Sequence, residues 1–222
     1  FLNIFKPILI FLPFVLVTLI LGAWQLYRLD WKNNLIESFN LLGKSNPVEL
    51  EDAEIKEFLK IKTTGTINRK KKIFFPAKTL NGKAGIRLAS EFISNKGKIY
   101  LLDEGWFKNN DRSYFKSNND VFEEVIVGYI RFPRKAKFFT PSNNLRNNEW
   151  YTYNLNTISD FLNIPLENKF FIKKMSVNKE VFLIPSSHRH EFRNNHLHYA
   201  ITWFCMSFSF LILFLVYLKK NK

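Results

Sequence analysis

The sequence predicts an α+β membrane protein in which two transmembrane helices flank an antiparallel β-barrel or sandwich domain with short helices. No residue from Pro7 to Tyr27 is charged, and the same holds from Leu197 to Leu218. Each run is long enough to cross the ~30 Å hydrocarbon core of a bilayer. Between the runs, short stretches rich in β-branched and aromatic residues recur between turn residues, which favours a barrel or sandwich.

The two apolar runs divide the chain into five segments. Trp24, Gln25 and Arg28 stand where a signal peptide would have small residues for cleavage, so we expect an uncleaved anchor. The chain opens with Phe1 rather than Met, so a transit peptide remains open. Flanking charges do not settle the orientation, and we take the termini as cytoplasmic. We expect an N-terminal tail (1–7), a first transmembrane helix (8–29), an extracytoplasmic β-rich domain (30–196), a second transmembrane helix (197–218) and a C-terminal tail (219–222).

Periodicity and turn residues predict the secondary structure of the central region. The first helix is expected to continue over residues 29–44 and to end before the proline that follows. A short helix is expected over 48–60, where acids come early and lysines late. Another is expected over 156–164, capped by Thr157 or Ser159. Strands are expected over residues 62–67, 72–79, 85–93, 98–107, 122–132, 149–155, 168–175 and 179–185, with a hairpin loop over 94–98.

The charge and cysteine content exclude several classes of protein. The formal net charge is +14, but the basic residues are scattered apart from two clusters, at 68–72 and 131–137. We expect both clusters to be solvated faces, with contact to anionic lipid headgroups as the alternative, and we expect no nucleic-acid partner. Cys205 is the only cysteine and lies in the second apolar run. The central domain therefore has no disulfide, thiol-redox motif or cysteine zinc site.

Catalytic motifs are absent from the sequence. It contains no G-x-S-x-G, H-E-x-x-H or Walker motif. Glu123 and Glu124 are adjacent on a predicted strand and point to opposite faces, so they do not form an acid–base pair. We therefore expect that this protein is not an enzyme.

All four histidines fall between residues 188 and 198, at the start of the second apolar run. His196 and His198 are two residues apart on a helix and diverge by about 200°, so they do not readily share a metal ion. His196, Tyr199 and Trp203 share one helix face. Two interpretations stand. Either these residues are an interfacial belt that anchors the span, or neutral His196 offers a ring nitrogen to haem iron or another metal.

A second group of candidate residues ends the first apolar run. Arg28 lies four residues after Trp24 and three after Gln25, so both are its neighbours on the helix. An arginine at the end of a span either snorkels to the headgroups or pairs with a carboxylate, and a haem propionate is a carboxylate that would lie at this boundary. Arg28 and His196 both adjoin the central domain, so they must meet the same leaflet.

Four motifs give the chain a resemblance to a known family. They are "LGAWQLYRLDWK" (residues 21–32), "NNHLHYAITWF" (194–204), "TPSNNLRNNEWYTYNL" (140–155) and the Gly-Trp pair of "LLDEGWF" (101–107). The sequence resembles the surfeit locus protein 1 family of cytochrome c oxidase assembly factors over residues 21–218. One departure concerns charge: the family usually has Asn-Arg-Gly-Trp where this chain has Asp103, Glu104, Gly105 and Trp106. Glu104 therefore inverts the charge at the arginine position.

The resemblance implies a function in the biogenesis of the haem–copper oxidase. For bacterial relatives it implies transient binding of haem a and delivery toward the catalytic subunit, with His196 as the haem-linked histidine. We hypothesise that Arg28 meets a propionate, that Gln25 belongs to the same site, and that Trp24, Tyr199 and Trp203 pack on the macrocycle. The alternative is a cofactor-free, membrane-anchored scaffold that holds an oxidase subunit. Aromatic residues of the central domain would then lie in the interface, namely Trp106, Trp150, Tyr151 and Tyr153.

The same resemblance sets expectations for partners and location. We expect contact with the oxidase catalytic subunit, with haem a synthase as a possible second partner, and with the lipid bilayer. The expected location is a bacterial inner membrane, with the central domain in the periplasm and both termini in the cytoplasm. The mitochondrial inner membrane is the alternative.

Overall fold

The computed structural model describes residues 2–80, 82–175, 183–185 and 194–220. The chain divides into two compact units. The first unit comprises Phe1–Ser38 with Glu191–Lys222, and the second comprises Phe39–His190. Two long helices form the first unit, and a β-rich domain with short helices forms the second, which confirms the predicted membrane-anchored α+β class.

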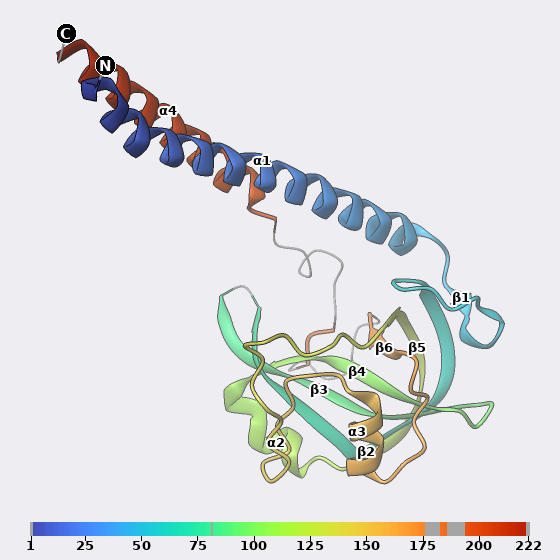
Figure 1. Ribbon diagram of the computed structural model, residues 1–222. Helices are drawn as coiled ribbons and strands as arrows, with labels where there is room; N and C mark the ends of the chain where they lie inside the picture. The colour runs from blue at the N-terminus through green and yellow to red at the C-terminus, as the bar shows by residue number, and fades with distance from the viewer. Residues whose placement is uncertain (1, 81, 176–182, 186–193, 221–222) are drawn as a thin grey trace. The chain divides into compact units, whose positions relative to one another are not determined.

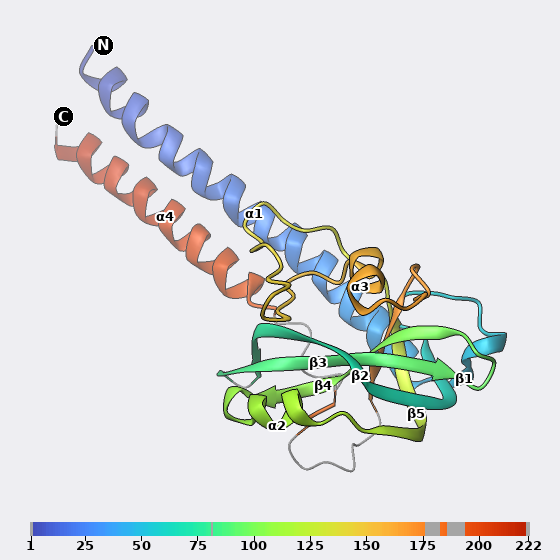
Figure 2. The same cartoon turned by 90° about the horizontal axis from the view of Figure 1, so that it is seen from below.

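The first unit is a pair of helices that run side by side, α1 (Leu2–Lys44) and α4 (His196–Lys220), with their terminal ends together (Figures 1 and 2). The stretch 8–41 of α1 and the whole of α4 are long and apolar enough to cross a membrane. Only 11% and 6% of the most apolar windows are buried, so most of these side chains face outward, as lipid contact requires.

The two helices meet along a seam of residues spaced alternately three and four apart. Phe11 contacts Phe214 with ring centroids 5.9 Å apart, and the Ser207 hydroxyl donates to the Val15 carbonyl at 3.3 Å. Gly22 allows the closest approach, because a Cβ there would lie 2.6 Å from the Phe204 ring. This alternation is that of a left-handed helix pair. Buried or half-buried seam positions are Phe11, Val15, Thr18, Gly22 and Gln25 on α1, and His196, Ala200, Trp203, Ser207, Phe210 and Phe214 on α4.

Helix α1 continues beyond the apolar run, as predicted, and ends at Lys44, shortly before Pro47. Its last turns belong to the second unit. There Phe39 is 1% exposed and packs edge-on against Phe58 and Tyr129, with ring centroids 5.0 and 5.4 Å away. This packing stabilises the last turns of α1, which extend beyond the apolar run.

Hydrogen-bonded strands of the second unit close into a ring. Strand β2 pairs with β3 and β5, β3 with β4, and β5 with β6, all antiparallel. A parallel pairing of β4 with β6 completes the ring, and β1 adds to β2 in parallel. The predicted β domain is mainly antiparallel, apart from these two short parallel pairings, and its strand pairings form a closed ring. The strands are β1 (Val48–Glu49), β2 (Lys60–Leu80), β3 (Lys83–Ser94), β4 (Ile99–Lys108), β5 (Val121–Arg131) and β6 (Phe171–Lys174).

Short helices connect the strands, and one of them was predicted. Helix α3 (Leu155–Leu162) occupies most of the expected range, but Asn154 caps it by accepting from the Thr157 N–H, so the predicted caps were wrong. The helix predicted over 48–60 was also wrong. That segment forms β1 and the 3₁₀ turn η1 (Leu50–Asp52), because Leu50 is buried in the barrel core. The 3₁₀ turn η2 (Asn109–Asp111) and helix α2 (Arg112–Ser117) were not predicted.

The strands predicted over 149–155 and 179–185 had different outcomes. The strand expected over 149–155 was wrong, because this segment has only isolated bridges at Glu149 before α3 begins. Its alternating aromatics pack against the outside of the barrel instead. In the strand expected over 179–185, residues 179–182 lie outside the described residues. Within the remainder, Ile184 exchanges two backbone hydrogen bonds of 2.7 Å with Trp106.

The core has two layers, one inside the ring and one outside it. Inside lie Ile61, Ile67, Phe92, Leu102, Ile126, Ile130 and Ile172, among others. Outside, Trp150 and the α3 residues Leu155, Ile158 and Leu162 pack against Ile73, Phe75, Leu101 and Phe171. Strand β4 is buried on both faces. Its consecutive carboxylates, Asp103 and Glu104, are therefore both inside the protein.

Candidate functional site

Where α4 begins, the apolar seam gives way to polar side chains. His196 contacts Gln25, and the Asn194 side-chain amide donates to Asn33 Oδ1 at 2.9 Å. Arg28 lies on α1 between the two α1 members of these pairs, about 4.5 Å along the axis from Gln25. We call Gln25, Arg28, Asn33, Asn194 and His196 the polar layer. It marks one end of the paired part of the two helices.

His196 is half-buried, and a short hydrogen bond to Gln25 orients its ring. The distance from His196 Nδ1 to Gln25 Oε1 is 2.7 Å. The amide oxygen is an acceptor, so Nδ1 donates, and the lone pair of the neutral ring then lies on Nε2. Metal-binding histidines usually donate the second ring nitrogen to such a partner, which fixes the tautomer and the ring plane. His196 therefore fits the role of a metal ligand.

Arg28 is held by aromatic rings. Its guanidinium carbon lies 4.6 Å from the centre of the Trp31 ring and 6.0 Å from that of Trp24. Its Nε is buried and has no hydrogen-bond partner among the described residues. A buried donor without a partner is costly, and the guanidinium geometry matches a carboxylate in two parallel hydrogen bonds. Arg28 thus fits an acidic group of a ligand, such as a propionate.

The structure brings some of the predicted site residues together and separates others. Gln25 and His196 are in direct contact, and Trp203 lies on the same seam seven residues, about two helix turns, after His196. Tyr199 is 54% exposed and lies outside the seam, and Trp24 is 50% exposed. These two rings face the surroundings of the helix pair rather than its interior.

Some residues were missed and some lie beyond the described chain. Sequence reasoning did not include Trp31, although its spacing of three residues from Arg28 was a usable signal. The contact between Asn33 and Asn194 had no signal in the sequence. His188 and His190 lie outside the described residues. Among the described residues, no three His, Cys, Asp or Glu side chains are grouped as a metal site, so the polar layer offers a metal one protein ligand.

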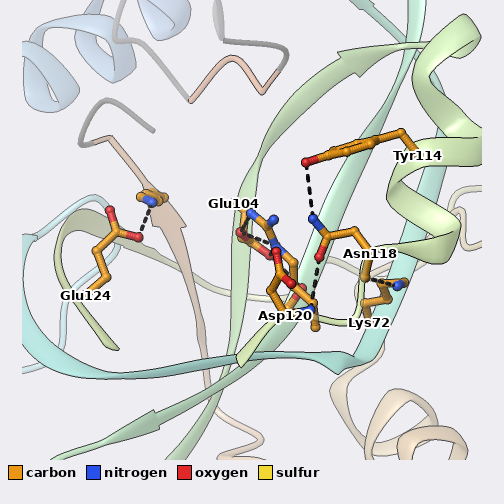
Figure 3. Close-up of polar contacts among 9 residues, drawn as sticks. Lys72, Glu104, Tyr114, Asn118, Asp120 and Glu124 are labelled. Carbon is orange, nitrogen blue, oxygen red and sulfur yellow. Dashed lines mark hydrogen bonds and ion pairs between the residues drawn. The ribbon is translucent and has the colours of Figure 1, made fainter. Parts of the chain in front are cut away.

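The other concentration of charge lies inside the barrel and corrects a prediction. Residues 68–72 were expected to be a solvated face, but Arg69 is 2% exposed and Lys72 is 8% exposed. Arg69 Nη2 lies 2.6 Å from Glu104 Oε2, and the Ser90 hydroxyl donates to Glu104 Oε1 at 2.6 Å (Figure 3). Glu104, at the family's arginine position, is therefore neutralised internally.

Lys72 lies beside this pair and completes its environment. Its Nζ donates to the Asn118 carbonyl (Figure 3). It also donates to Asn119 Oδ1 at 3.0 Å. Burial lowers the pKa of Lys72, and the neighbouring Arg69 charge lowers it further, against the opposing effect of Glu104. These groups satisfy one another, so the cluster is structural.

A similar cluster lies on the outer face of β4. Arg87 Nε donates to both oxygens of Asp103, at 2.9 and 2.8 Å, and the Tyr153 hydroxyl donates to Asp103 Oδ2 at 2.8 Å. Burial alone would lower the pKa of Arg87, but Asp103 and Tyr153 more than offset it, so the pKa is raised. The Tyr153 ring is stacked between Phe75 and Phe171. The charged groups of this cluster are also internal and pair with one another.

Aromatic residues expected at a partner interface are mostly internal. Trp150 is fully buried and Trp106 is 4% exposed. Tyr153 is half-buried within its ring stack. The polar layer is consequently the place in the described chain where side chains suited to a cofactor gather.

Comparisons with known proteins agree on one family. The SURF1 family model matches residues 12–208, a range that includes the polar layer. A SURF1-like protein of Rickettsia conorii is 30% identical over 220 residues, covering 95% of this chain and 91% of the relative. One from Rickettsia bellii is 31% identical over 213 residues, covering 92% and 88%. Surfeit locus protein 1 of Takifugu rubripes is 25% identical over 226 residues, covering 91% and 93%.

Proposed function

This chain belongs to the SURF1 family, and we propose that it is an assembly factor for haem–copper cytochrome c oxidase that binds haem a and passes it to the catalytic subunit. The observation that carries the proposal is the polar layer. It combines a histidine oriented by Gln25 with an arginine whose buried Nε has no partner among the described residues. One group suits iron, and the other suits a propionate.

The apolar helices suit the rest of the cargo. Haem a carries an isoprenoid tail that is too apolar for water, and the outward faces of α1 and α4 keep such a tail in lipid. Trp24 and Tyr199, both exposed, and half-buried Trp203 supply aromatic surface near His196 for the macrocycle. A carrier must also release its cargo, and a single protein ligand is easier to exchange than two.

We further propose a location and partners for this activity. Two apolar helices anchor the chain in a membrane, and the Rickettsia relatives are bacterial proteins. The inner membrane of a bacterium, with the β domain in the periplasm and both termini in the cytoplasm, fits a factor of the respiratory chain. The catalytic subunit of the oxidase is the proposed recipient, and haem a synthase is the proposed donor. The protein acts as a chaperone and not as an enzyme.

The direct test is the visible spectrum of the reconstituted full chain with haem a. The wild type should shift the Soret band on binding, and His196→Ala should abolish the shift because the iron loses its ligand. His198→Ala is the matched control, since His198 is exposed and diverges from His196 on the same helix. An unchanged Soret shift in His196→Ala would overturn the ligand assignment.

Gln25 provides a second prediction for the same site. Gln25→Ala should weaken haem a binding by about tenfold or more, because a ligand histidine without its hydrogen-bond partner loses orientation and basicity. Gln25→Glu keeps an acceptor at the same position and should bind close to the wild type. Titration of haem a into both variants measures the difference. Equal affinities for Gln25→Ala and the wild type would show that the 2.7 Å contact does not serve binding.

The cofactor-free scaffold predicts the opposite pattern in cells. If His196→Ala leaves oxidase activity normal, and haem-free protein still co-purifies with the catalytic subunit, the scaffold explains the family function without haem. The burial of Trp106 and Trp150 removes much of the sequence support for that alternative.

A further inference from the structure

A tight turn of the β domain exposes two adjacent phenylalanines. Phe138 is 94% exposed and Phe139 is 91% exposed, the largest values among the large apolar side chains of the described residues. The flanking residues close the turn: the Thr140 N–H donates to the Lys137 carbonyl, and the Lys137 N–H donates to Thr140 Oγ1, both at 2.9 Å. The two rings meet edge-on with centroids 5.0 Å apart. The turn thus presents an ordered aromatic tip.

Cations surround this tip. The segment from Val125 to Asn148 contains no acidic residue, and its cations are Arg131, Arg134, Lys135, Lys137 and Arg146. Arg131 is half-buried and lies 3.3 Å from Glu57. Arg134 lies 3.7 Å from Glu57 and is exposed, as are Lys135 and Lys137. This basic cluster differs from the one at 68–72, whose Arg69 and Lys72 are used inside the barrel. Exposed cations next to exposed aromatic rings characterise surfaces that bind a membrane interface.

We propose that the turn from Lys137 to Thr140, together with Lys135, docks the β domain on anionic phospholipid headgroups of the bilayer that the helices span. The aromatic rings enter the interfacial region, where removing the apolar surface of a Phe side chain from water is favourable in free energy. The lysines attract anionic lipid, an effect that falls off within a Debye length and so needs close contact. Because α1 and α4 tether the domain to the same membrane, the effective concentration of lipid at the turn is high. Even a weak interaction therefore keeps a sizeable fraction of molecules docked.

A cavity beside the turn provides donors for a headgroup phosphate. Its volume is about 270 Å³, and its lining residues include Arg134, Lys135, Asn154, Asn156 and Asn168. Guanidinium, ammonium and amide N–H groups all donate to phosphate oxygens. The cavity shares the segment from Pro133 to Ala136 with the approach to the turn. Docking of the rings would therefore bring headgroups to these donors.

The test uses the full chain in nanodiscs, with an environment-sensitive fluorophore at one cysteine. Cys205→Ser removes the native thiol, and Ser142→Cys places the probe two residues beyond the turn while both rings remain. We expect a blue shift and quenching by spin-labelled lipids in discs that contain phosphatidylglycerol, and neither in phosphatidylcholine alone. A probe at Lys96→Cys, in the exposed basic hairpin between β3 and β4, has no aromatic tip beside it and should not respond.

Two sets of variants separate the parts of the proposal. Phe138→Ser with Phe139→Ser should remove the response, and the fold should survive because these exposed rings contribute little packing. Lys135→Glu and Lys137→Glu should each reduce the docked fraction about fivefold or more. An Ser142 probe whose emission ignores both lipid composition and these variants would overturn the proposal. So would a response that appears only when membrane proteins are added, because the occupant would then be a protein partner.

Discussion

Replacing Arg69 by methionine is expected to destabilise the β domain by about 3–5 kcal/mol, because it leaves a buried carboxylate without its countercharge. Glu104 is fully buried, and Arg69 contacts it through Nε and Nη2, at 3.1 and 2.6 Å from Oε2. The Ser90 hydroxyl would remain as a donor to Glu104. One neutral hydrogen bond does not replace a bidentate charged pair. Pulse proteolysis of the full-length protein in urea measures the loss.

The double variant distinguishes the pair from ordinary packing. Arg69→Met combined with Glu104→Leu removes both charges and should recover most of the loss, since apolar replacement of a buried ion pair is often neutral or stabilising. Lys56→Met, which breaks an ion pair to Glu54 exposed on both sides, should change stability by less than about 0.5 kcal/mol. If the double variant is as unstable as Arg69→Met alone, loss of the Arg69 side-chain packing explains the effect.

The fold followed from local patterns wherever neighbours in sequence are neighbours in space. The hairpin of β3 and β4 and strand β5 were predictable because alternation and turn residues act within a few positions. Residues 149–155 carry the same alternation, but Tyr153 uses it to stack between Phe75 and Phe171 outside the barrel. Alternation of apolar and polar residues indicates that one side of a segment is buried. A strand also needs a neighbouring strand to hydrogen-bond with, which the alternation does not provide. Only the three-dimensional packing decides between the two.

The charged interior was beyond sequence reasoning for a related reason. Arg69 belongs to the basic run at 68–72, whose composition is typical of a solvated face, and its partner Glu104 is 35 residues away in the sequence. Nothing local identifies one lysine or arginine of such a run as internal. A register irregularity between Asn68 and Lys72 in the pairing of β2 with β3 accompanies the burial of Arg69 and Lys72. Bulges of this kind re-aim side chains and have no reliable sequence signature.

The candidate site was predictable residue by residue but not contact by contact. Gln25 and His196 were both proposed from their places at the ends of the apolar runs, and the structure joins them at 2.7 Å. Helix spacing alone also grouped Tyr199 with His196, although Tyr199 falls outside the seam. A single helix has several faces that satisfy the same spacing. The partner helix selects one of them, so the register between α1 and α4 was needed.

Arg28 carries the second large expected effect, which rests on the proposed binding of haem a. Arg28→Gln should weaken haem a binding by roughly ten- to a hundredfold, the equivalent of about 1.5–3 kcal/mol for a charge-assisted hydrogen bond. The Trp31 ring, 4.6 Å from the guanidinium, holds the side chain in place, and its buried Nε lacks a partner among the described residues. Insertion and folding should be unaffected, because a polar residue at the end of a span is easily accommodated.

Arg28→Lys separates propionate pairing from simple snorkelling. An ammonium keeps the charge but lacks the planar fork and the stacking on Trp31, so lysine should restore binding only in part. If Arg28 merely reaches for the headgroups, lysine will substitute fully and glutamine will bind haem a as the wild type does. Haem a titrations of the three proteins, compared with His196→Ala, also keep the two assignments apart. A Soret shift that survives in Arg28→Gln at higher haem concentration, but never in His196→Ala, would assign the iron to one residue and the propionate to the other.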